Sequence, residues 1–110
     1  MAANMKLATI IVTLTFSLGS AFAAGDATAG KAVYDRACKA CHGATGTANP
    51  GMAKAMNVEI KDLGSSDVQT MSDADLKKIV SDGKGKMKPV GSVTGKSVDD
   101  VVAFVRTLKK

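Results

Sequence analysis

Apolar and polar residues alternate along most of this chain with the period of an α-helix, and almost no segment has the two-residue alternation of a strand. The first segment with helical periodicity predicts a helix over residues 27–41. Asp26 stands where an N-cap belongs, and small or apolar residues recur at helical spacing after it. These positions are Gly30, Val33, Tyr34, Ala37 and Cys41.

The second half of the chain predicts two more helices. Ser72 and Asp75 form a pair like a capping box and Gly83 supplies a stop, so a helix is expected between them. The last helix is expected to begin at a Ser97 cap. Its acidic first turn and basic last turn complement the helix dipole, and its apolar surface comes from Val98, Val101, Val102, Phe104, Val105 and Leu108.

The segments between these helices are less regular. Glycine, asparagine and proline in residues 43–53 predict a loop, and a short helix is expected over residues 52–57. Residues 58–69 show no clean period. Residues 83–96 predict a long, glycine-rich, basic loop.

The N-terminal segment has the features of a secretory signal peptide over residues 1–23. Lys6 is its only charge, an apolar stretch follows from Leu7 to Leu18, and Ala21-Phe22-Ala23 is an A-x-A cleavage site. The apolar run is short for a membrane span. The prediction is therefore removal of residues 1–23 and one exported domain over residues 24–110, with a retained N-terminal anchor helix as the alternative.

The predicted mature domain is small and has few large apolar side chains. Tyr34 and Phe104 are its only aromatic residues, and it has no tryptophan. Domains of this size usually need a metal, a cofactor or disulfides to fold stably. The whole chain carries 15 Lys and Arg against 10 Asp and Glu, a formal net charge of +5. Without aromatic platforms, this charge does not favour nucleic-acid binding.

The segment Cys38-Lys39-Ala40-Cys41-His42 reads C-x-x-C-H, the pattern of covalent haem attachment. On a helical turn, spacing i, i+3 puts both sulfurs on one face, and His42 follows directly. A C-x-x-C pair is also compatible with a disulfide, a thioredoxin-like redox pair or half of a zinc site. A redox pair is expected beside a βαβ pattern, and a zinc site needs four ligands, whereas the chain has two Cys and one His. Haem attachment is the prediction.

If His42 is one iron ligand, a methionine is the available soft donor for the opposite position, because the chain has no other histidine. Met87 is preferred because it lies in an irregular loop with no periodic reason to be apolar, two residues before Pro89. Met56 is the second candidate. Methionines more often fill gaps in a core than bind a metal. Met52 and Met56, at i, i+4, are interpreted as one helical face that packs on the haem, and Met71 as a hydrophobic staple before the Ser72 cap.

With these motifs, nearly all of the predicted mature chain resembles the small class I c-type cytochromes. Gly30 and Tyr34 match the family's first helix, the Cys38–His42 motif its attachment site, and residues 101–105 its closing helix. The resemblance implies an all-α fold of three to five helices wrapped around one covalently bound haem c. It also implies that Pro50 accepts a hydrogen bond from the axial histidine. The chain departs from the family at Lys88, which separates Met87 from the following proline.

The function implied by the resemblance is electron transfer in the periplasm by a soluble monomer that is not an enzyme and does not insert into the membrane. Its partners would be a protein electron donor and acceptor. Four lysines cluster around Met87 in the sequence, Lys84, Lys86, Lys88 and Lys96, and Lys39 lies in the attachment segment. Together they suggest docking to an acidic patch on the partner, with ordinary surface charges that keep the protein soluble as the alternative. The alternative is a haem sensor or weak peroxidase with an open or labile sixth iron position.

Overall fold

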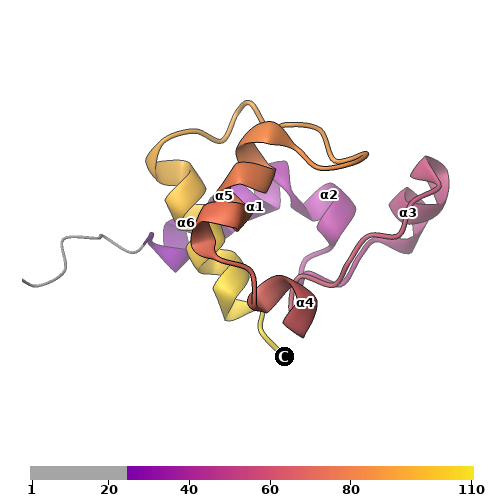
Figure 1. Ribbon diagram of the computed structural model, residues 1–110, viewed down its shortest axis with the longest axis horizontal. Coiled ribbons are helices and arrows are strands. Elements are labelled where there is room, and N and C mark those ends of the chain that lie inside the picture. The colour runs from indigo at the N-terminus through magenta and orange to yellow at the C-terminus, as the bar shows by residue number, and fades with distance from the viewer. Residues whose placement is uncertain (1–24) are drawn as a thin grey trace, which may run out of the picture.

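The computed structural model describes residues 25–110, which contain six helices joined by loops (Figure 1). The predicted signal peptide and its cleavage site lie outside the described residues. Two of the six helices, α2 and α4, are single turns, and for this reason the structure has more helices than the three to five predicted. The helices are α1 (Ala27–Ala37), α2 (Lys39–His42), α3 (Pro50–Met56), α4 (Ser66–Gln69), α5 (Asp73–Asp82) and α6 (Lys96–Thr107).

The core is centred on the crossing of α1 and α6. At Gly30 the backbones are so close that a Cβ atom would lie 1.8 Å from the carbonyl oxygen of Asp100. Beside this contact, the fully buried Tyr34 ring tilts at 53° against Phe104, with 4.9 Å between ring centroids. Val101 completes the packing with 1% of its surface exposed. The first and last helices are therefore in direct contact at this crossing.

Two predicted helix boundaries need correction. The first helix does not run unbroken to Cys41, because Cys38 leaves helical geometry at φ −122° and separates α1 from α2. The last helix is capped by Gly95 at φ +57° and not by Ser97. The Ser97 N–H donates to the Thr94 carbonyl at 3.2 Å, so Ser97 already lies within the first turn.

The remaining helices lie close to their expected positions. The short helix α3 begins at Pro50, where a missing N–H costs nothing, and the Asn49 side chain caps it by accepting from Gly51 and Met52. The Ser72 hydroxyl accepts from the Asp75 N–H at 3.1 Å and starts α5 as predicted. The stretch without a clean period contains only α4.

No helix within residues 25–110 has the length and apolar character needed to cross a membrane.

Candidate haem site

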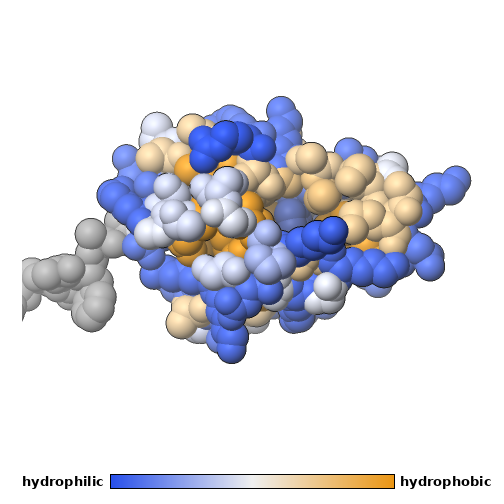
Figure 2. Space-filling view, turned by 90° about the horizontal axis from the view of Figure 1, so that it is seen from above, coloured by the Kyte–Doolittle hydropathy of each residue, from blue (hydrophilic) through white to orange (hydrophobic). Residues whose placement is uncertain are grey.

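A cavity of about 570 Å³ opens beside α1 and α6. Hydrophobic residues are visible between hydrophilic ones on the face that carries α5, and toward the side of α3 (Figure 2). The volume falls within the range of about 300–1,000 Å³ typical of sites for small molecules and cofactors. Its apolar lining comes from Ala37, Val58, Ile60, Leu63, Val68, Leu76, Ile79, Val80, Val90, Val101, Val102 and Val105.

Cys38 and Cys41 lie together at the junction of α1 and α2, and both line this cavity. They are half-buried free thiols in one helical turn, with the Cys41 N–H donating to the Cys38 carbonyl at 3.2 Å. Burial, and then the neighbouring Cys41, raise the pKa of the Cys38 thiol. As free thiols that line the cavity, both are available for bonding to a group inside it.

His42 ends α2 and lines the same cavity. Its Nδ1 is buried and has no hydrogen-bond partner within the described residues. Burial lowers the pKa of the imidazole, which favours the neutral form that binds metals. A neutral imidazole beside two thiols, in an apolar space of this size, fits a covalently attached haem.

Tyr34 fixes the attachment segment to the core. Its hydroxyl donates to the carbonyl of Gly43, the residue after His42, at 2.6 Å. Burial is the main cause that raises the pKa of Tyr34 to about 12, so it remains a donor at neutral pH. The sequence suggested only a core role for Tyr34, and no sequence signal marks its hydrogen bond to Gly43.

Met87 lies in a tight turn after α5 and also lines the cavity. The turn is closed by two backbone hydrogen bonds, from the Lys84 N–H to the Met87 carbonyl at 2.9 Å and from the Met87 N–H to the Lys84 carbonyl at 3.0 Å. Met56 and Met71 line the cavity too. The structure thus brings Cys38, Cys41, His42 and Met87 to one space, together with two other methionines.

Pro50 lies elsewhere. It is exposed at the first position of α3 and is not among the residues that line the cavity. Because His42 Nδ1 has no partner within residues 25–110, the hydrogen bond expected from the resemblance is not formed in this structure. The role of Pro50 stays a prediction for the haem-loaded protein.

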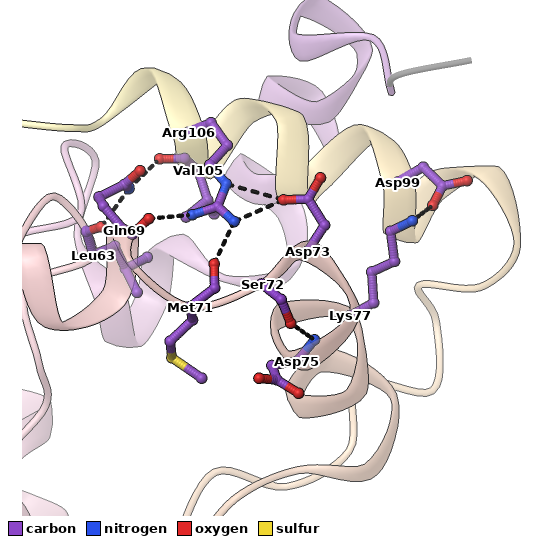
Figure 3. A network of polar contacts seen from close by, with 10 residues as sticks. All are labelled: Leu63, Gln69, Met71, Ser72, Asp73, Asp75, Lys77, Asp99, Val105 and Arg106. Atoms are coloured by element: carbon purple, nitrogen blue, oxygen red, sulfur yellow. Dashed lines mark hydrogen bonds and ion pairs between the residues drawn. The ribbon is translucent and has the colours of Figure 1, made fainter. Parts of the chain in front are cut away.

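A polar network behind the cavity holds the segment that carries Met71 against α6 (Figure 3). The Arg106 guanidinium donates to the carbonyls of Gln69 at 2.9 Å and Met71 at 2.6 Å, and to the Asp73 carboxylate at 2.7 Å. The Gln69 amide donates to the carbonyl of Val105 at 2.9 Å. Neither Arg106 nor Gln69 stands out in the sequence, since a basic residue near a helix C-terminus is already explained by the helix dipole.

Comparison with known proteins agrees with this geometry. The family model described as "Cytochrome C oxidase, cbb3-type, subunit III" matches residues 25–105. The chain belongs to this family of c-type cytochromes. Such proteins carry covalently bound haem c and take part in electron transfer, typically with partner proteins and usually after export.

One solved structure supports the fold of this cytochrome. The protein titled "KustC0563 c-type cytochrome" aligns with a TM-score of 0.62 and 24% sequence identity, over 74% of this chain and 98% of that one. At this identity the likeness shows the all-α cytochrome fold alone. No curated protein matches the chain at a significant level.

Proposed function

We propose that this cytochrome is a soluble, monomeric electron carrier of the periplasm that holds one haem c through thioether bonds at Cys38 and Cys41. His42 and Met87 are the two axial ligands of its iron, and it has no enzymatic activity. The observation that carries the proposal is that all four residues line the same apolar cavity. When bound, haem supplies a one-electron iron couple.

The residues of the cavity suit a carrier better than an enzyme. An imidazole and a thioether together leave no open position for a substrate. A neutral thioether opposite histidine favours the reduced form of the iron relative to a second histidine. The apolar walls lower the local dielectric and limit access of water, which tunes the potential further.

The absorption spectrum of the ferric protein tests this assignment. We expect a weak far-red band typical of methionine bound to haem iron, which Met87→Ala abolishes and the matched Met56→Ala variant retains. Protein from a haem-maturing host should show the mass of residues 24–110 plus one haem. If the wild-type protein lacks the band and binds CO rapidly at neutral pH, the carrier role is wrong and the sensor or peroxidase alternative replaces it.

The charge near the cavity supports an acidic partner. Four lysines contribute to its lining against one carboxylate, that of Glu59; they are Lys61, Lys84, Lys86 and Lys88. Lys39 and Lys96 do not line it, and Lys96 pairs with Asp100 at 2.7 Å. We expect electron transfer with an acidic redox protein to slow as salt rises, since exposed charges are screened. Lys88→Gln should flatten this dependence more than Lys109→Gln, which changes a lysine away from the cavity. Rates that do not vary with salt would contradict electrostatic steering.

A further inference from the structure

Lys86 joins two parts of the cavity wall that are far apart in the sequence. Its Nζ donates to the backbone carbonyls of Met56 at 2.5 Å and Asn57 at 3.2 Å. Both acceptors lie at the C-terminal end of α3, where carbonyls lack helical partners and the helix dipole is negative. Lys86 is exposed and also lines the cavity, so the contact crosses the cavity's edge.

Neither of the joined segments is fixed by the core. No residue of α3 is buried, and among the helices α3 packs mainly against α2. Figure 1 shows α3 projecting from the rest of the molecule. On the other side, Gly85 at φ +57° has open space around the position of a Cβ. Segments with so few buried contacts open at low free-energy cost.

The turn makes Lys86 and Met87 move together. The two backbone hydrogen bonds between Lys84 and Met87 enclose only Gly85 and Lys86, so the turn behaves as one small unit. A restraint on the Lys86 ammonium is therefore a restraint on the neighbouring Met87 backbone. The same restraint acts on Met56, because its carbonyl is one of the acceptors.

We propose that Lys86 is a positioning residue, whose ammonium clasps the turn that bears Met87 to the end of α3 across the edge of the cavity. The clasp slows opening of this edge and keeps Met87 directed to the cavity. The clasp itself is a contact within the chain, whereas its effect on iron rests on the proposed function.

Native-state hydrogen exchange on the purified haem-loaded protein tests the clasp. Lys86→Met keeps the length of the side chain and removes its donors. We expect exchange of the Met87 and Val58 amides to become about fivefold to tenfold faster, the size expected from losing one or two charge-assisted hydrogen bonds at an exposed site. Lys86→Arg should restore slow exchange. Lys88→Met, with the same loss of charge at the same cavity, should leave both amides as in the wild type.

The second readout is binding of added imidazole to the ferric protein, followed through the far-red band. Lys86→Met should accelerate it, and Lys88→Met should not. If Lys86→Met exchanges like the wild type at both amides, or if Lys88→Met has an equal effect, the clasp is wrong. If the wild type shows no far-red band, the assignment of Met87 as an iron ligand is wrong. Hydrogen exchange at the Met87 and Val58 amides still tests whether the Lys86 clasp exists.

Discussion

The α1–α6 crossing and the wall formed by α3 and the loop after α5 are built in different ways. The crossing is packed, because α6 alone contributes five buried residues, including Val101 and Phe104. The wall contains no buried residue of α3, and its loop sends only Val93 into the core. Elsewhere it is joined by backbone turns and the Lys86 contact. One region is therefore stabilised by its own side chains. The other surrounds a space that a bound group must fill to stabilise it.

The largest expected effect comes from removing the attachment thiols. Cys38→Ala/Cys41→Ala should abolish covalent haem and with it the cooperative thermal unfolding seen by far-ultraviolet circular dichroism. The reason is that a small domain with an unfilled apolar cavity of about 570 Å³ has too little buried surface to offset chain entropy.

The control for this variant is Lys39→Ala, which changes a residue between the thiols and leaves the motif intact. It should melt like the wild type. A cooperative, native-like melt of the double variant without haem would show that the wall folds unaided, and the distinction between the two regions would disappear.

A smaller effect is expected from adding one methyl group to a glycine in each region. Gly30→Ala places a Cβ 1.8 Å from the Asp100 carbonyl and forces α1 and α6 apart, which should cost about 2–4 kcal/mol in the free energy of unfolding. Gly91→Ala in the loop meets nothing within 4 Å and should change it by no more than about 0.5 kcal/mol. Urea unfolding of both haem-loaded variants measures the contrast, and equal losses would contradict it.

The sequence predicted the packed region better than the wall. Periodicity and resemblance together identified Gly30, Tyr34 and Phe104, because a helix crossing requires a small residue and large apolar neighbours at fixed spacing. The N-cap at Ser72 could be predicted because its partner, Asp75, lies only three residues away. These features are local or repeat with a known period, so one sequence suffices to find them.

The missed features depend on contacts between distant residues or on a backbone change inside a continuous pattern. Helical spacing continues through Cys38, so nothing in the sequence marks the break between α1 and α2. Lys86 is one of several lysines in a polar loop, and only the fold brings it to the end of α3. Four of the five predicted site residues reach the cavity, whereas Pro50 does not line it.

The smallest expected effect concerns a buried carboxylate in the packed region. Asp100 accepts from the Lys96 ammonium at 2.7 Å and from the Asp26 N–H at 2.8 Å, which ties the start of α1 to α6. The hydrogen bond from Lys96, and then that from Asp26, lower the pKa of this carboxyl below its usual 3.8. Unfolding therefore raises the proton affinity of Asp100.

The sign of the pH dependence follows from that difference. The stabilisation by Asp100 is complete above the unfolded pKa near 3.8 and is lost as pH falls through the lower folded pKa. Asp100→Asn should thus reduce stability at neutral pH and flatten the acid limb of the curve of unfolding free energy against pH. Lys96→Met, which removes the largest cause of the shift, should reproduce most of the flattening while leaving the Asp26 contact. An acid limb as steep as that of the wild type in Asp100→Asn would mean that the tie between α1 and α6 adds no pH-dependent stability, and that apolar packing alone holds this region together.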